Sequence, residues 1–247
     1  MNVTVLGAGA SFPRPGGACS GFLVSEGDSH VWVDAGNGTF SRLTEVLPLS
    51  DLDALILTHL HADHIADVLP LMYALALDSH AREVPLPLYA PGPVDKGVAV
   101  FLGGASREMF ARVFDHRPID GTITVGELVI EPFRTNHPVE SYGLRFSSDG
   151  RRVVYTSDTA IYPQLVEECR EADLLICEAT YVDGVKADPD VHMWAREAGT
   201  VAAKAGVKSL VLTHVLPTAD PAQAVAEAAK EYSGPIEAAV EGKRYTI

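Results

Sequence analysis

The hydrophobic and polar positions in the first third of the chain predict a series of short strands, because apolar residues alternate or run on over strand lengths. These predicted strands are VTVLG, GFLVS, HVWVD and DALILT, the last at residues 53–58. Apolar residues at helical spacing over residues 65–78 then predict a helix directly after the fourth strand. A short strand is expected at residues 86–89, and residues 94–115 are expected to be helical with a break at Gly103-Gly104.

A second series of strands follows, and in its later part the strands alternate with helices. The expected strands are residues 128–133, 142–146, 153–157, 174–177, 209–213 and 236–240, and the expected helices are residues 193–205 and 221–232. Strands first, then strands alternating with helices, in two similar halves, predict an α/β fold of two packed sheets with helices outside. Because the sequence has no repeats and no low-complexity linker, we interpret residues 1–247 as a single domain.

The composition is that of a soluble globular protein, with 47% hydrophobic and 21% charged residues. No apolar run reaches the roughly 18–20 residues needed to span a bilayer, and the N-terminus lacks the features of a signal peptide. Three scattered cysteines, Cys19, Cys169 and Cys177, form no CxxC motif, so we expect free thiols. Together these features predict a cytoplasmic protein that does not contact a membrane.

The net charge argues against a large nucleic-acid footprint. A formal charge of −14 repels phosphate backbones at long range unless basic residues cluster. Only short basic pairs occur, such as Arg151-Arg152 and Lys243-Arg244. A small anionic substrate held by a cation remains compatible with this charge.

Candidate site residues, of which seven are candidate metal ligands and Glu178 and His192 are not, follow or flank several predicted apolar strands, where loops on a rigid sheet usually carry chemistry. They are His59, His61, Asp63, His64, His137, Asp158, Glu178, His192 and His214. In a loop, residues two apart can point the same way, so His59 and His61 can share one ion. Asp63 and His64 are then directed to a neighbouring position. Imidazole and carboxylate suit Zn²⁺ and also Mn²⁺ or Fe²⁺, and this many groups suits two ions that share a bridging carboxylate.

The motif HxHxDH at residues 59–64, followed in order by His137, Asp158 and His214, resembles the metal-binding pattern of the metallo-β-lactamase superfamily. The resemblance covers nearly the whole chain. It implies a four-layer αββα sandwich with two divalent metal ions, expected to be Zn²⁺, at the sheet edges. By that pattern one ion is bound by His59, His61 and His137, the other by Asp63, His64 and His214, and Asp158 bridges the two.

A second resemblance concerns the branch of the family. The segments EATYVDGV, VHMWAREAGTVAAKAG, LGAGASFPRP and LTHVLP resemble those of the ribonuclease Z-like phosphodiesterases. This implies that His192 lies beside the scissile phosphate and is catalytic, and Glu178 could orient it. Members that process tRNA usually insert a long arm before the bridging Asp, whereas here residues 138–157 suffice only for a hairpin with its turn at 147–150. A small or cyclic nucleotide phosphodiester is therefore the favoured substrate.

We therefore expect a metal-dependent phosphodiesterase with a metal-bound hydroxide, in which Asp63 orients or accepts a proton and His192 donates one to the leaving oxygen. The alternatives are a ribonuclease Z-type tRNA 3′-processing endonuclease and, less favoured, a glyoxalase II-like thioesterase, whose usual helical domain is not expected after His214. A non-catalytic binding or redox module is a third alternative. Two structural interpretations stay open: His192 could simply begin a helix, and Glu178 or Asp67 could serve the fold alone. Because ribonuclease Z-like relatives are often dimers, a homodimer is a further expectation.

Overall fold

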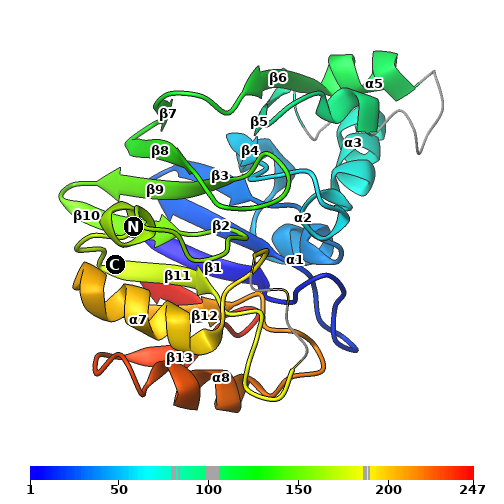
Figure 1. Cartoon of the computed structure of the whole chain (residues 1–247). Coiled ribbons are helices and arrows are strands. Elements are labelled where there is room, and N and C mark those ends of the chain that lie inside the picture. The colour runs from blue at the N-terminus through cyan, green and yellow to red at the C-terminus, as the bar shows by residue number, and fades with distance from the viewer. Residues whose placement is uncertain (79–81, 83, 98–105, 186–187, 189) are drawn as a thin grey trace.

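The chain folds into two seven-stranded sheets packed face to face (Figure 1). The computed structural model describes residues 1–78, 82, 84–97, 106–185, 188 and 190–247. The first sheet has the order β14-β1-β2-β3-β4-β5-β6 and the second has the order β13-β12-β11-β10-β9-β8-β7. The strands of the first sheet are β1 (Asn2–Gly7), β2 (Gly21–Glu26), β3 (Ser29–Val33), β4 (Ala54–Ile56), β5 (Leu86–Ala90), β6 (Phe114–Pro118) and β14 (Arg244–Thr246). Those of the second are β7 (Ile123–Val125), β8 (Leu128–Arg134), β9 (Tyr142–Ser148), β10 (Arg151–Tyr155), β11 (Leu174–Glu178), β12 (Leu210–Thr213) and β13 (Ile236–Ala238).

Helices cover the outer face of each sheet, which gives four layers. They are α1 (Thr39–Val46), α2 (Ala62–Ile65), α3 (Val68–Leu77), α5 (Ser106–Val113), α6 (Leu165–Glu168), α7 (Ala195–Ala205) and α8 (Pro221–Ala228), with a 3₁₀ turn at Leu49–Asp51. One apolar core lies between the sheets and includes Phe22 of the first sheet and Phe146 of the second. A second core lies under α1, α3 and α5, and a third lies under α6, α7 and α8. The predicted αββα sandwich is therefore confirmed.

Parallel pairing brings the carboxyl ends of several strands to one edge of each sheet. In the first sheet β3, β4, β5 and β6 are parallel neighbours, and in the second β10, β11, β12 and β13 are. Loops that follow parallel strands meet at the same edge, which is where α/β proteins bind ligands. The polar residues after β4, β10, β11 and β12 are therefore gathered by topology.

The segment between β9 and β10 is a tight hairpin, as the sequence predicts. Ser148 pairs with Arg151, so Asp149 and Gly150 alone form the turn. Both have positive φ, at 49° and 72°, which is the backbone of a type I′ turn and is well served by an Asp-Gly pair. The hairpin leaves no residues over for an inserted arm.

Two predicted helices differ from the observed elements. The helix expected at residues 65–78 is divided into α2 and α3, because the Asp67 amide donates to the Ala35 carbonyl oxygen at 2.8 Å and so leaves the helical ladder. The helix expected at residues 94–115 ends at Val113, because Phe114 begins β6 by pairing with Leu86. The predicted break at Gly103-Gly104 lies outside the described residues. Helix α1 and strands β6, β7 and β14 were not predicted.

Candidate metal centre

The predicted ligands come together where the strands end. His59 and His61 lie in the loop after β4, Asp63 and His64 lie in α2, and His137, Asp158 and His214 follow β8, β10 and β12. Backbone strain marks the same edge, since Asp34, Ser157 and His214 have φ values of 57°, 54° and 56°. Left-handed backbone is uncommon for residues other than glycine and often occurs at functional sites.

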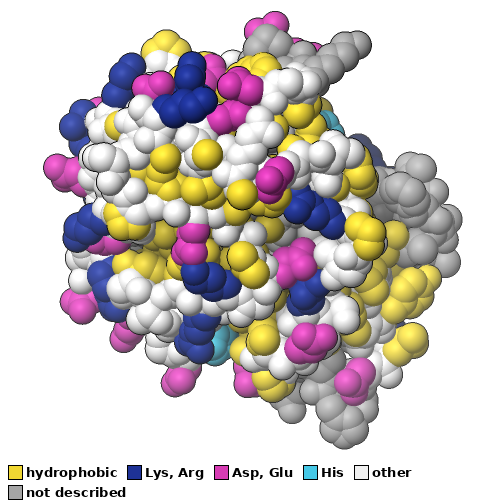
Figure 2. All heavy atoms as spheres, turned by 90° about the horizontal axis from the view of Figure 1, so that it is seen from below, with side chains coloured by type: hydrophobic (Ala, Val, Ile, Leu, Met, Phe, Trp, Pro, Cys, Tyr) yellow, Lys and Arg dark blue, Asp and Glu magenta, His cyan; other side chains and the backbone are white. Residues whose placement is uncertain are grey.

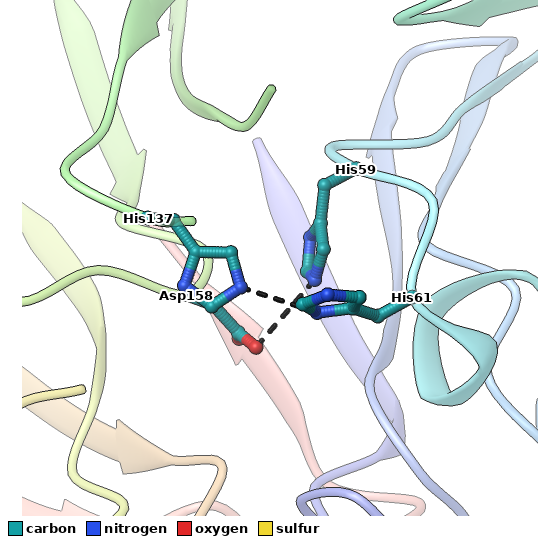
Figure 3. Close-up of side chains that lie close together, drawn as sticks. All are labelled: His59, His61, His137 and Asp158. Atoms are coloured by element: carbon teal, nitrogen blue, oxygen red, sulfur yellow. Dashed lines mark hydrogen bonds and ion pairs between the residues drawn. The ribbon is translucent and has the colours of Figure 1, made fainter. Parts of the chain in front are cut away.

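The first group consists of His59, His61, His137 and Asp158, whose ligand-type atoms all lie within 4.8 Å of one another (Figure 3). Nε2 of His137 lies 3.2 Å from Nδ1 of His61, and Nε2 of His59 lies 3.6 Å from Oδ2 of Asp158. Complete burial lowers the pKa of His59 well below its ordinary value, and the neighbouring imidazoles lower it further. The imidazole is therefore neutral, which is the form that binds a metal.

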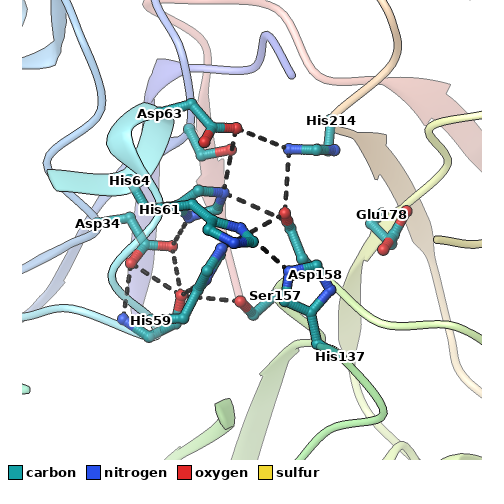
Figure 4. A network of polar contacts seen from close by, with 12 residues as sticks. Asp34, His59, His61, Asp63, His64, His137, Ser157, Asp158, Glu178 and His214 are labelled. Atoms are coloured by element: carbon teal, nitrogen blue, oxygen red, sulfur yellow. Dashed lines mark hydrogen bonds and ion pairs between the residues drawn. The ribbon is translucent and has the colours of Figure 1, made fainter. Parts of the chain in front are cut away.

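The second group consists of Asp63, His64, His214 and again Asp158, with ligand-type atoms inside the same 4.8 Å limit (Figure 4). Nε2 of His214 lies 3.3 Å from an oxygen of Asp63 and 3.3 Å from one of Asp158. Nε2 of His64 lies 3.3 Å from the other oxygen of Asp158. Asp158 thus faces both groups, with one carboxylate between two sets of histidines.

The donor set fits divalent ions. Nε2 of His59, Nε2 of His64 and Oδ1 of Asp158 are buried atoms that have no hydrogen-bond partner among the described residues. Buried polar atoms are nearly always satisfied, so three such atoms at one place indicate a missing partner. A cation between imidazole nitrogens and carboxylate oxygens would satisfy all three. The structure brings together all seven residues predicted as ligands, while their action as ligands stays a prediction.

Asp34 holds the back of this cluster. Its buried carboxylate accepts hydrogen bonds from Nδ1 of His64 at 2.8 Å, from the Thr58 amide at 2.8 Å and from the Tyr155 hydroxyl at 3.0 Å. The Thr58 hydroxyl also donates to Asp34, and its oxygen lies 3.2 Å from Nδ1 of His59. With the Nδ1 protons turned towards Asp34 and Thr58, Nε2 of each histidine is left as the acceptor that a metal requires.

Glu178 holds the other side in a similar way. The carboxylate is completely buried and accepts from Nδ1 of His192 at 3.0 Å and from the Thr180 hydroxyl at 2.6 Å. The same Thr180 oxygen lies 2.8 Å from Nδ1 of His214. Glu178 therefore orients His192 directly and His214 through Thr180, and both contacts argue against a Glu that serves the fold alone.

His192 lies beside both groups without belonging to either. Its ring centroid is 5.4 Å from that of His137 and 5.1 Å from that of His214. Burial lowers the pKa of His192, but the Glu178 carboxylate outweighs burial and raises the pKa above its ordinary value. The Glu178 carboxylate therefore favours the protonated form of His192 at the edge of the cluster. His192 precedes α7, which begins at Ala195, so the predicted start of that helix at residue 193 is two residues early.

Asp67 belongs to neither ligand group and contacts the start of α1. Its side chain is 7% exposed, and its carboxylate accepts from the Phe40 amide at 2.8 Å, at the start of α1. Of the three histidines outside the candidate set, His30 contacts Ser25 at 2.9 Å and His116 is exposed, while His80 lies outside the described residues.

Sequence reasoning missed the residues behind the ligands, namely Asp34, Thr58 and Thr180. Asp34 follows a predicted apolar strand, so the rule that identified the other carboxylates applies to it too. Thr58 and Thr180 stand inside THLHADH and EAT and could have been read as hydrogen-bond partners for the histidines. The carbonyl of Val191, which accepts from Nδ1 of His137 at 3.2 Å, carries no signal in the sequence because it is main chain.

Comparison with known proteins agrees with this geometry. Residues 29–215 match the family model described as the Beta-lactamase superfamily domain. "Probable metallo-hydrolase YhfI" of Bacillus subtilis is 35% identical over 220 residues, 87% of each chain, and the crystal structure of YhfI covers 99% of both chains at 31% identity with a TM-score of 0.88. A ribonuclease Z of Mycobacterium bovis is 32% identical and spans 96% of this chain and 95% of its own. The human short-form tRNase Z shares the fold, at 24% identity and a TM-score of 0.79 over 100% of this chain and 99% of that one.

A four-layer sandwich, two histidine and carboxylate groups at its edge and relatives over nearly the whole length all lead to one assignment. The chain belongs to the metallo-β-lactamase superfamily and is one of its metallo-hydrolases.

Proposed function

We propose that this metallo-hydrolase is a phosphodiesterase that binds two divalent metal ions and cleaves a small or cyclic nucleotide phosphodiester. The observation that carries the proposal is the Glu178–His192 pair beside both ligand groups. A hydrolase needs an acid for the leaving oxygen, and a histidine with a raised pKa next to the metal ligands can supply it.

Each of the two ligand groups would hold one ion. His59, His61 and His137 would hold one ion, Asp63, His64 and His214 the other, and Asp158 both, with Zn²⁺ preferred and Mn²⁺ or Fe²⁺ compatible with the same donors. Two such ions, when bound, would supply Lewis-acid polarisation of the substrate and would lower the pKa of water there. The protein fixes the imidazoles through Asp34 and Glu178, so their orientation precedes substrate binding.

Two side chains would handle protons. Asp63 has a carboxylate oxygen 3.3 Å from Nε2 of His214 and a side chain that is 11% exposed, and we propose that it orients the attacking water and accepts its proton. His192 would donate the proton of Nε2 to the leaving alkoxide, while Nδ1 stays bonded to Glu178. The side chain of His192 is 13% exposed, which leaves this imidazole open to a substrate.

A small substrate is favoured over tRNA. The segment between His137 and Asp158 is filled by the short loop before β9 and by the β9–β10 hairpin, so no arm extends from it to grip RNA. The net charge of −14 opposes a polyanion, and on the face seen in Figure 2 the Lys and Arg side chains are interspersed with Asp and Glu.

The second candidate function is tRNA 3′ processing. The observation that favours it is the ribonuclease Z of Mycobacterium bovis, which aligns with this chain over 96% of its length. A tRNA substrate would then have to be held without an arm at this position. Measured activity must decide between the two candidates.

The direct test is hydrolysis by the Zn²⁺- or Mn²⁺-loaded protein of 3′,5′-cAMP, 2′,3′-cyclic nucleotides and a 3′-extended tRNA precursor in parallel. Hydrolysis of a cyclic nucleotide is expected, and efficient trimming of the precursor alone would overturn the preference. His192→Ala should retain both metals and lose most of its activity on the cyclic nucleotide, whose alkoxide leaves slowly unless it is protonated, with His116→Ala as the control. Lost metal would make His192 a ligand, and an unchanged rate would make it a bystander.

The setting of the enzyme is part of the proposal. Cys19, Cys169 and Cys177 are buried free thiols, which suits a reducing cytoplasm. Among the residues described, no helix is both long and apolar enough to cross a membrane. A homodimer is proposed because ribonuclease Z-like relatives are often dimers. Light scattering after gel filtration would measure the oligomeric state directly.

A further inference from the structure

The loop between β11 and α7 carries groups for two histidines of the site. Val191 accepts a hydrogen bond from Nδ1 of His137, and the next residue is His192 itself. The loop closes on itself at its base, where the Tyr181 amide donates to the Met193 carbonyl at 3.1 Å and the Ala195 amide donates to the Tyr181 carbonyl at 2.8 Å. The position of this loop therefore sets both a predicted ligand and the proton donor.

Helix α8, in the outer layer, binds the first part of the loop, after β11, through hydrogen bonds to Asp183. The Asp183 amide donates to Oε1 of Glu227 at 2.9 Å, and the Gln223 side-chain amide donates to the Asp183 carbonyl at 2.9 Å. Gln223 also donates to Oε1 of Glu227 at 2.8 Å. Both main-chain groups of one loop residue are thus held by two side chains one helical turn apart.

Glu227 is an unusual residue for this position. Its side chain lies in the protein interior with 4% exposure, and it forms no ion pair with a Lys or Arg among the described residues. Burying a carboxylate without a cation is costly, and such residues are rare. The hydrogen bonds that Glu227 accepts from the Asp183 amide and from Gln223 provide a reason for its presence.

The returning side of the loop is tied to the same helix by packing. The loop ends where α7 begins, and α7 lies directly against α8 (Figure 1). A Cβ on Gly199 of α7 would lie 2.4 Å from the Ala228 carbonyl oxygen of α8, so only glycine permits this approach. The loop is therefore held against α8 on both sides, by hydrogen bonds at Asp183 and by the packing of α7 where the loop ends.

We propose that Gln223 and Glu227 are positioning residues that fix the loop carrying Val191 and His192. They act through Asp183 and touch neither the ligand groups nor a substrate. Loss of the clamp would let the loop move and would misplace His192 and the Val191 carbonyl together. The effect on turnover rests on the proposed phosphodiesterase function, whereas the effect on the loop and on metal affinity does not.

The test compares Glu227→Ala, Glu227→Gln and Gln223→Ala with Glu231→Ala. Glu231 is the control, because it lies in the turn that follows α8 and also contacts α7, through Arg196 at 3.5 Å, but has no contact with the loop among the described residues. Three quantities are measured on the metal-loaded protein: amide hydrogen exchange at residues 182–185 and 191–195, metal affinity by competition with a chelator, and kcat and KM on bis-p-nitrophenyl phosphate.

Glu227→Ala and Gln223→Ala should raise loop exchange about fivefold to tenfold, as expected for one or two lost buried hydrogen bonds. They should weaken metal binding by about tenfold through His137 and lower kcat more than they raise KM. Glu227→Gln should recover part of each loss, because its side-chain oxygen can still accept from Asp183. If Glu227→Ala does not fold, Gln223→Ala carries the test. Loop exchange and metal affinity equal to those of Glu231→Ala would overturn the proposal, even if the wild-type protein hydrolyses no phosphodiester.

Discussion

Asp34 offers the sharpest test of how the metal centre is organised, through the substitution Asp34→Asn. Asparagine tolerates the left-handed backbone at this position, where φ is 57°, so the change is confined to the side chain. The amide has one acceptor where the carboxylate has two. If the NH₂ group replaces Oδ2, it faces two donors, Nδ1–H of His64 and the Tyr155 hydroxyl.

A change of tautomer in His64 would remove the repulsion between the new NH₂ group and Nδ1–H at the lowest cost in free energy. Its proton would move to Nε2, which leaves Nδ1 free to accept from the new amide. Nε2 of His64 is the atom that faces Asp158 and would bind the ion, and a protonated nitrogen cannot do so. If the NH₂ group instead replaces Oδ1, it meets the Thr58 amide, which cannot change its role.

Either arrangement should weaken metal binding by 10- to 100-fold, the usual cost of losing a partner that orients a ligand. This corresponds to about 1.4–2.7 kcal/mol. The assay is competition with a chromophoric chelator, with Asp173→Asn as the control, because Asp173 accepts from Lys208 and the Arg152 amide and has no contact with the ligand groups. Metal affinity within twofold of the wild type would refute the reasoning.

Three further predictions concern stability. Asp67→Ala removes the acceptor for the Phe40 amide at the start of α1, and urea unfolding should show a loss of about 1 kcal/mol with unchanged metal affinity. Chelation of the metals should lower the melting temperature and added Zn²⁺ should restore it, because the ions bind only the folded cluster; an unchanged melting temperature would contradict the assigned site. Burial raises the pKa of Asp173, but Lys208 outweighs burial and holds the pKa below its ordinary value. Its stabilising effect is therefore present near neutral pH and is lost as the pH falls below the ordinary carboxyl range, so the stability gap between the wild type and Asp173→Asn should close in acid.

The sequence predicted those parts of the molecule that depend on residue type in order along the chain. The spacing of His59, His61 and Asp63 identifies them as candidate ligands, and the apolar run before them predicts a buried strand. Contacts between residues that only folding brings together could not be predicted in this way. Asp34 reaches His64 because β3 lies beside β4, and the Val191 carbonyl reaches His137 across 54 positions.

Edge strands were missed for another reason. β6 is mostly exposed, with the sequence FDHRP, and β14 has only three residues. Neither has the apolar alternation that marks a half-buried strand, so partners in the fold and not local preference make them strands. Helix α1 is preceded by Gly38, which offers no side-chain cap, and Asp67, from a distant part of the chain, supplies an acceptor to the Phe40 amide.

The pairing of β1 with β14 has a consequence for how the chain is made. Asn2 pairs with Thr246 and Thr4 pairs with Arg244, so β1 is synthesised long before the strand that covers its outer edge. Until then β1 presents unpaired amides and carbonyls, which is the usual starting point for aggregation. Closing so long a loop is also slow in entropic terms. Deletion of residues 244–246 should therefore lower the yield of soluble protein during synthesis. It should have a smaller effect on activity at the candidate metal centre, which lies at the other end of the strands.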